Sequence, residues 1–134
     1  MKRVFFLSIV ALLLVPSTVY GQLVVNPTKA IFNPSTDHAT IENEVPLVTN
    51  YELRIFIPNG TVPIRVLNIN KPDPDANNDI TVSITALIAS LPVGEYFATV
   101  AAKGPGGEAV STPSNPFTVV ARPPTAPTTL RITK

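Results

Sequence analysis

The chain has 134 residues, of which 45% are hydrophobic and 14% are charged, and it contains 15 prolines and no cysteine. The apolar content is sufficient for a core and argues against intrinsic disorder, while the prolines argue against a helical bundle because each removes a backbone donor. The absence of cysteine excludes a disulfide scaffold, a thiolate zinc site and a cysteine nucleophile. A formal net charge of +1 gives no indication of nucleic-acid binding.

Residues 1–21 have the pattern of a secretory signal peptide. Two basic residues near the start precede an apolar run over residues 4–15, and a small-residue site ends at Gly21. The run is too short to span a bilayer stably, so we expect cleavage before Gln22, the alternative being an uncleaved anchor helix. The sequence thus predicts a secreted, periplasmic or cell-surface protein with no membrane span after removal of the signal.

Beyond Gln22, apolar and polar residues alternate with a period of two, which is typical of half-buried strands. Clusters of Pro, Gly, Asn and Asp separate the candidate strands, which are residues 23–25, 29–32, 51–57, 62–69, 80–86, 95–103 and 117–120. A single helical turn is possible at residues 86–90, before Pro92 and Gly94 stop it. Seven short strands at this spacing predict an all-β, antiparallel sandwich formed by residues 22–121.

The pair Asn59-Gly60 lies between two apolar runs and predicts a tight hairpin. Both residues tolerate the positive φ that a two-residue type I′ turn requires. Such a turn would place Arg54 opposite Arg65 across the hairpin.

A recognisable series of motifs follows the fifth candidate strand. Leu91-Pro92-Val93-Gly94-Glu95-Tyr96 precedes an alternating segment, a glycine-rich turn at residues 104–107, and then Ser111 and Ser114. This order resembles the E–F corner, strand F, F–G loop and strand G of a fibronectin type III domain, and the likeness covers about residues 28–120. The resemblance implies a seven-stranded immunoglobulin-like β-sandwich with a structural corner at Leu91 and Tyr96. The Tyr96 hydroxyl would anchor that corner by bonding an otherwise unpaired backbone group.

The chain departs from the family pattern in its first half. Phe32 stands in place of the tryptophan usual on strand B, and the stretch from Pro34 to Asn50 is longer than a typical B–C connection. No Arg-Gly-Asp triplet occurs, so animal-type integrin adhesion is not carried over.

The only histidine lies in a polar cluster with Ser35 and Asp37. A Ser-His-Asp triad needs groups that converge from separate segments around an oxyanion hole, whereas these residues are neighbours in the sequence. We interpret Ser35, Asp37 and His38 as residues that cap a turn.

Two other segments invite a ligand-binding interpretation. Acidic residues recur through residues 73–79 as in the first half of a calcium loop, but Asn78 replaces the glycine and Ile84 the final glutamate of that motif. A solvated loop explains the same residues, so calcium binding stays open.

The glycines of residues 104–107 lead into a strand instead of a helix, so they predict a hairpin tip and not a phosphate loop. We therefore assign no catalytic residue, cofactor or metal ligand.

The candidate interaction face lies on the outer side of the central strands. Alternation along these strands turns a set of aromatic, basic and apolar side chains away from the core. The set consists of Arg54, Phe56, Arg65, Leu67 and Phe97. Its composition resembles that of binding hot spots. The competing interpretation is that residues 73–79 or the C-terminal tail fold over this face and hide it.

A proline-rich tail forms residues 122–134. It could be a spacer, a strand that folds back, or the remnant of a second module.

The resemblance implies a non-catalytic binding or structural module whose partner is a protein or a cell-envelope polymer, and not nucleic acid. The alternatives are a carbohydrate-binding accessory module and a small extracellular hydrolase, for which the sequence offers no tryptophan to stack on sugars and no convergent catalytic set.

Overall fold

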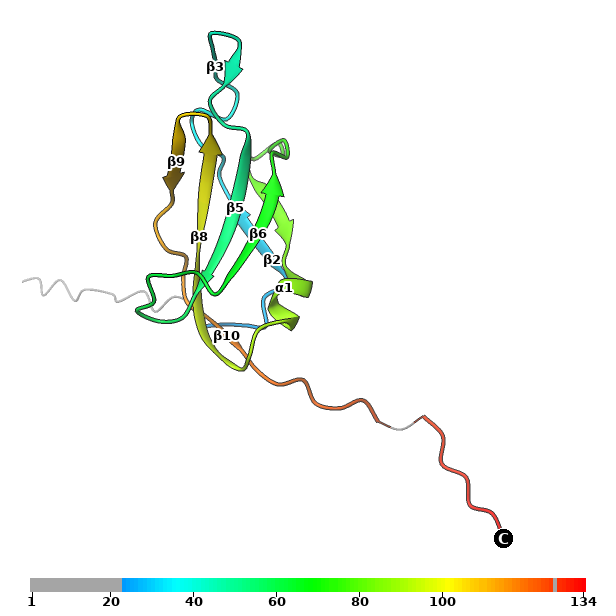
Figure 1. The fold of residues 1–134 in the computed structure, drawn as a ribbon. Coiled ribbons are helices and arrows are strands. Elements are labelled where there is room, and N and C mark those ends of the chain that lie inside the picture. Colours follow the sequence, from blue (N-terminus) through cyan, green and yellow to red (C-terminus); the bar gives the residue numbers. More distant parts are fainter. Residues whose placement is uncertain (1–22, 127) are drawn as a thin grey trace, which may run out of the picture.

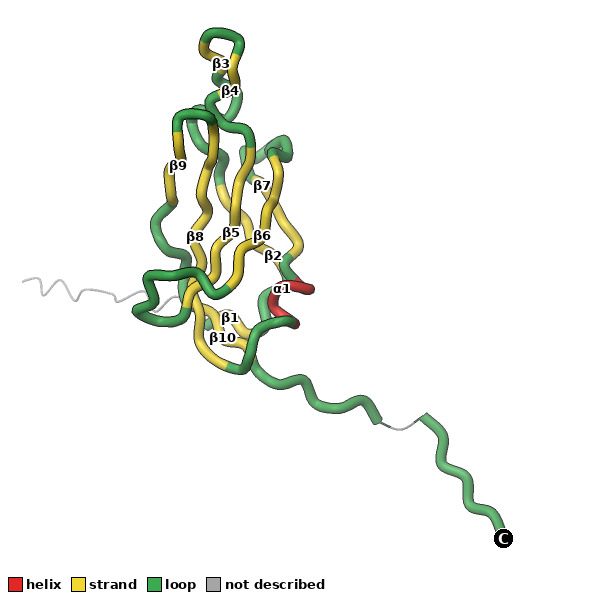
Figure 2. Tube along the Cα trace, in the orientation of Figure 1, coloured by secondary structure: helices red, strands yellow, loops and turns green. Residues whose placement is uncertain are grey.

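The computed structural model describes residues 23–126 and 128–134, so the predicted signal peptide lies outside the described residues. The described chain is all-β with one short helix (Figures 1 and 2). The strands are β1 (Val24–Val25), β2 (Lys29–Phe32), β3 (Ile41–Glu42), β4 (Val45–Pro46), β5 (Asn50–Phe56), β6 (Arg65–Asn70), β7 (Ile80–Ser83), β8 (Gly94–Gly104), β9 (Gly107–Val110) and β10 (Phe117–Val119), and the helix is α1 (Thr85–Ala89).

The strands form one large sheet and two small ones. The large sheet has the order β1-β10-β8-β5-β6, and β9 also pairs with β8. The small sheets are the pairs β2–β7 and β3–β4. Figures 1 and 2 show β2 and β7 behind the large sheet, so the described strands form two layers. All strand pairs are antiparallel except β1 and β10, which are parallel. The prediction of a wholly antiparallel arrangement is therefore wrong at this pair, because β1 pairs with the last strand and not with the strand that follows it in the sequence.

The core lies between the two layers. On β5, Tyr51, Leu53 and Ile55 are 1%, 3% and 0% exposed, and the intervening residues are half-buried. From the opposite layer, Ala30 and Val82 pack against the same core. The period-two pattern therefore identified the buried side of β5 correctly, because successive strand residues point to opposite faces.

All seven predicted strands overlap observed strands, and α1 overlaps the predicted helical turn. The predicted hairpin tip at residues 104–107 is confirmed, because it joins β8 to β9, although β9 was not given bounds among the candidate strands. The β3–β4 hairpin was not predicted. The β3–β4 hairpin turns through Asn43 and Glu44, both at positive φ, and it projects beyond the two layers (Figure 2). Its strands have two exposed residues each, so no alternation between buried and exposed positions marks them in the sequence.

The predicted two-residue turn at Asn59-Gly60 is wrong. Pro58 and Asn59 occupy the centre of the turn, and the Gly60 N–H donates to the Ile57 carbonyl at 2.9 Å. Proline fixes φ near the value required at the first central position, and Asn59 supplies the positive φ of 60° at the second. The connection between β5 and β6 consequently spans residues 57–64.

The longer connection changes the register of β6. Val66 lies opposite Arg54 and Leu67 opposite Leu53, so the predicted pairing of Arg54 with Arg65 does not occur. Leu67 packs against the core, while Val66 is 51% exposed. Placing Leu67 on the outer face was therefore wrong, because a shift of one residue exchanges the two faces of a strand.

Neither segment that was expected to cover the outer face lies over it. The exposed C-terminal tail runs away from both layers (Figure 1). The acidic loop is held at the end of β2, where the Asn33 amide donates to the Asp79 carboxylate and to the Asn78 carbonyl, both at 2.9 Å.

Candidate interaction face

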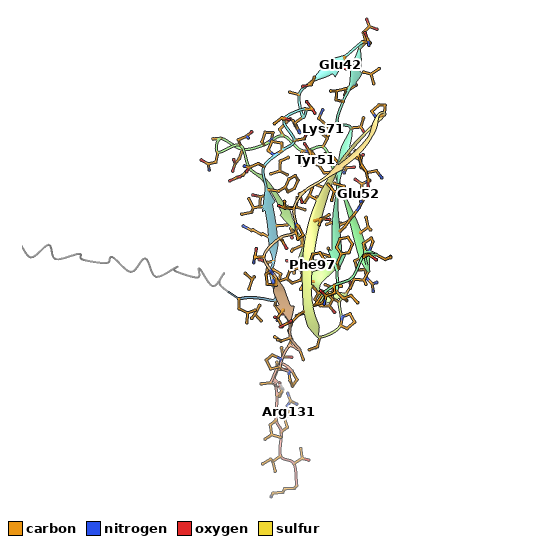
Figure 3. The ribbon with its side chains drawn as sticks, turned by 90° about the vertical axis from the view of Figure 1, so that its left-hand side faces the viewer. Glu42, Tyr51, Glu52, Lys71, Phe97 and Arg131 are labelled. Carbon is orange, nitrogen blue, oxygen red and sulfur yellow. The ribbon has the colours of Figure 1, made fainter. Side chains whose placement is uncertain are left out.

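The outer face is the side of β5, β6, β8 and β9 that points away from the core. On it, register places Phe56 opposite Phe97, and the two rings stack with centroids 5.2 Å apart and planes 9° from parallel. Both side chains are half-buried. Figure 3 labels Phe97 toward the end of the molecule where the tail leaves. Aromatic stacking across neighbouring strands thus builds an apolar patch at this end of the outer face.

A linked set of ion pairs lies beside the two rings. Arg54 donates to both carboxylate oxygens of Glu108, at 2.9 and 2.6 Å, and to Glu52 Oε2 at 3.0 Å. Lys103 Nζ donates to Glu52 Oε1 at 2.8 Å. We call Lys103, Glu52, Arg54 and Glu108 the ionic network. Its fork-shaped Arg–carboxylate contact fixes the Arg54 head group more firmly than a single bond would.

The contacts within the ionic network shift the pKa values of Glu52, Arg54 and Glu108. Hydrogen bonds from Lys103 and then Arg54 lower the pKa of Glu52, and the hydrogen bonds from Arg54 lower the pKa of Glu108. The same bonds, to Glu108 and then to Glu52, raise the pKa of Arg54. Glu52, Glu108 and Arg54 are consequently charged at neutral pH.

Small residues of β8 lie underneath these side chains. Ala101 is opposite Glu52 on one side and Val110 on the other, and it is 0% exposed although it points outward. Thr99, opposite Arg54, is also buried, and its hydroxyl has no hydrogen-bond partner among the described residues. The ionic network and the phenylalanine pair therefore cover these small residues, beside the exposed side chains of Val66 and Val110.

The structure brings together three of the five residues predicted for this face. Arg54, Phe56 and Phe97 are neighbours, whereas Leu67 lies on the core side. Arg65 pairs with Ile55 and lies on the same side of β6 as Leu67, so its predicted place on the outer face is wrong as well. It is exposed at the start of β6, and its guanidinium donates to the Ile64 carbonyl at 2.8 Å.

Sequence reasoning missed Glu108 and Lys103. They are cross-strand partners on β8 and β9, whose hairpin closes at Gly104 and Gly107. The opposite charges on either side of this glycine turn were the signal that could have identified the pair.

The structural corner is a second site at which the predicted residues meet. Leu91 and Tyr96 are buried, and the Tyr96 hydroxyl donates to the Pro92 carbonyl at 2.8 Å. The Tyr96 ring also packs against Phe117, with centroids 5.8 Å apart. The phenol thus buries its ring and pairs a backbone carbonyl in the connection that enters β8.

The cluster around the only histidine is organised by Tyr51 of β5. The Tyr51 hydroxyl accepts the Ser35 N–H at 3.1 Å and lies 2.9 Å from His38 Nδ1, and the imidazole stacks on the phenol ring. Burial raises the pKa of Tyr51. Ser35 Oγ accepts the Asp37 N–H at 3.2 Å, as in a capped turn. The histidine's partner is thus the tyrosine and not the acid, and the arrangement ties this loop to β5.

The acidic loop uses its carboxylates to hold its own backbone. Asp75 Oδ1 accepts the N–H groups of Asn77 and Asp79, at 2.8 and 3.0 Å. In residues 23–126 and 128–134, no three His, Cys, Asp or Glu side chains are grouped in a way that could hold a metal ion. The loop is therefore an Asx-type turn in this structure.

Comparison of the chain with protein-family models, with curated proteins and with solved structures gives no significant match. No helix in the described part of the chain has the length and apolar character needed to cross a membrane.

Proposed function

We propose that this protein is an exported, non-catalytic binding or structural module of the fibronectin type III type. The contact between the Tyr96 hydroxyl and the Pro92 carbonyl supports the assignment to this class. A tyrosine at the start of a strand that bonds backbone a few residues upstream is a hallmark of immunoglobulin-like sandwiches. The two-layer strand arrangement supports it as well.

The outer face supports a binding role, and the observation that carries it is the stacked pair of Phe56 and Phe97 beside Arg54. Aromatic and arginine side chains are enriched among residues that dominate binding energy. Preordering matters too, because side chains already held in place lose less conformational entropy on binding. A protein or a cell-envelope polymer with both apolar and charged groups fits such a face.

A double variant tests this role. We expect Phe56→Ser with Phe97→Ser to abolish recovery of the partner in a pull-down from the producing cell, with little change in melting temperature. The matched control is Ile41→Ser with Val45→Ser, which also replaces two apolar side chains by serine but at exposed positions of the β3–β4 hairpin.

The outcomes distinguish binding from structure. Partner recovery that survives a mild-salt wash in the wild type and in the control, but not in the phenylalanine variant, supports the proposal. A large fall in melting temperature in the phenylalanine variant would show that the rings are structural, and equal recovery by all three proteins would exclude this face.

A further inference from the structure

One edge of β2 carries backbone groups that no described strand pairs. Among the described strands, only β7 pairs with β2. The Ile84 N–H donates to the Thr28 carbonyl at 2.9 Å, and antiparallel bonding alternates along the ladder. The backbone N–H and C=O groups of Lys29 and Ile31 therefore point away from β7, toward the open edge. Unpaired groups of this kind are a template for another strand.

An apolar groove lies along the same edge, between β2 and residues 111–115. Its volume is about 330 Å³, and core residues including Leu53, Ile55 and Phe117 line it. A second hollow of about 220 Å³ has Phe32, Val100 and Ser111 in common with it and extends it past the end of β2. We call the two hollows together the edge groove, which lies between β2 and the strands of the large sheet.

The first described strand does not cover this groove. β1 has two residues and pairs with β10, so it does not run beside β2. The opposite wall is fixed, because the N–H groups of Ser111 and Ser114 donate to β8 carbonyls at 2.9 and 2.8 Å. The edge groove is therefore a preformed site for an extended segment.

The C-terminal tail contains a segment with the pattern that such a site requires. Leu130 and Ile132 are 88% and 92% exposed and alternate with polar residues over residues 128–134. Prolines at positions 123 and 124 stiffen the preceding chain, and the tail runs away from the two layers of its own molecule (Figure 1). The geometry favours delivery to another molecule over folding back.

We propose that residues 128–134 of one molecule add as a strand to β2 of a second copy, with Leu130 and Ile132 in the edge groove. Seven residues at about 3.3 Å each extend over roughly 23 Å, enough to pass β2 and enter the second hollow. The register places Arg131 opposite Ile31, because the neighbouring outward position would bring it against Lys29. Repetition of this head-to-tail contact produces an open chain of molecules.

Sedimentation of the protein as the cell processes it gives the first test. We expect the average mass of the wild type to rise about twofold or more with concentration, as head-to-tail association requires. The variant Leu130→Asp with Ile132→Asp is expected to stay monomeric with an unchanged melting temperature, because both side chains are exposed. Ile41→Asp, at the other end of the molecule, is the control and should assemble as the wild type does. A wild type that is monomeric at every concentration, or a tail variant that still assembles, overturns the proposal.

Disulfide trapping tests the register, and the cysteine-free chain makes it specific. Residues paired through backbone hydrogen bonds on antiparallel strands have Cα atoms about 5.5 Å apart, within reach of a disulfide. We expect a tagged Ile31→Cys protein mixed with an untagged Arg131→Cys protein to form a mixed dimer on oxidation. The control mixture of Ile41→Cys with Arg131→Cys should not.

The chain carrying both Ile31→Cys and Arg131→Cys shows whether the edge groove is occupied by the tail of another copy or by the tail of the same molecule. Oxidised oligomers support pairing between copies. A monomer with an internal disulfide would show that the tail folds back onto its own β2, and the absence of any cross-link would show that the tail does not occupy the groove. Partner recovery through Phe56 and Phe97 does not involve this edge, so the two proposals can fail independently.

Discussion

Tyr96 contributes to stability through its hydroxyl hydrogen bond and through its buried ring, and two substitutions separate these contributions. Tyr96→Phe keeps the buried ring but removes the bond to the Pro92 carbonyl, and we expect it to lower the free energy of unfolding by about 0.5–1.5 kcal/mol. Tyr96→Ala also leaves a cavity beside Phe117 and is expected to cost about 3–5 kcal/mol. Denaturant titrations check the order, and equal, negligible losses would contradict the corner geometry.

The ionic network predicts how stability changes in acid. The folded-state pKa values of Glu52 and Glu108 lie below the ordinary value of 4.5, so their contribution to stability is complete above that pH. It is lost as the pH falls through the lowered pKa values. We expect thermal melts to show this loss below about pH 4.5, and added salt to weaken the stabilisation at neutral pH.

Arg54→Gln provides the control for this acid dependence. It removes the cation that both carboxylates contact, so the remaining acid dependence should be smaller than in the wild type. Identical pH profiles for the two proteins would show that the network does not stabilise the fold.

At the scale of elements, the register of β5 and β6 separates two adjacent residues. Leu67 packs against the core and Val66 is exposed. We expect Leu67→Ala to cost about 2–3 kcal/mol and Val66→Ala about 0.5 kcal/mol or less in chemical unfolding. A larger loss for Val66→Ala than for Leu67→Ala would instead support the register that the Asn59-Gly60 pair predicted.

The positions of the strands were more predictable than their partners. Alternation in β5 is a local property, so Tyr51 and Ile55 could be assigned to the core from the sequence. The residue of β6 that lies opposite Arg54 could not be assigned, because Pro58 favours a different turn from the one that Gly60 favours. The resulting shift of one residue places Leu67 instead of Val66 on the core side. Short elements such as β3 and β9 carry too few residues for a periodic pattern.

For the whole molecule, the N-terminal pattern predicts processing. We expect the exported protein to begin at Gln22, because the apolar run is short and a small-residue site precedes this position. Mass spectrometry of exported material checks this start. Exported protein that still carries Met1 would contradict it.

The sequence by itself determined the all-β class, the seven main strands and the buried side of β5, because a period of two and the distribution of proline and glycine act locally. Only the tertiary structure decided that Arg54 meets Glu108, since that contact depends on β9 returning beside β8. It likewise decided that, among the described strands, only β7 pairs with β2, because β1 pairs with β10 instead. Contacts between residues so distant in sequence depend on strand pairing, where alternative registers bury similar apolar area and no local pattern distinguishes them.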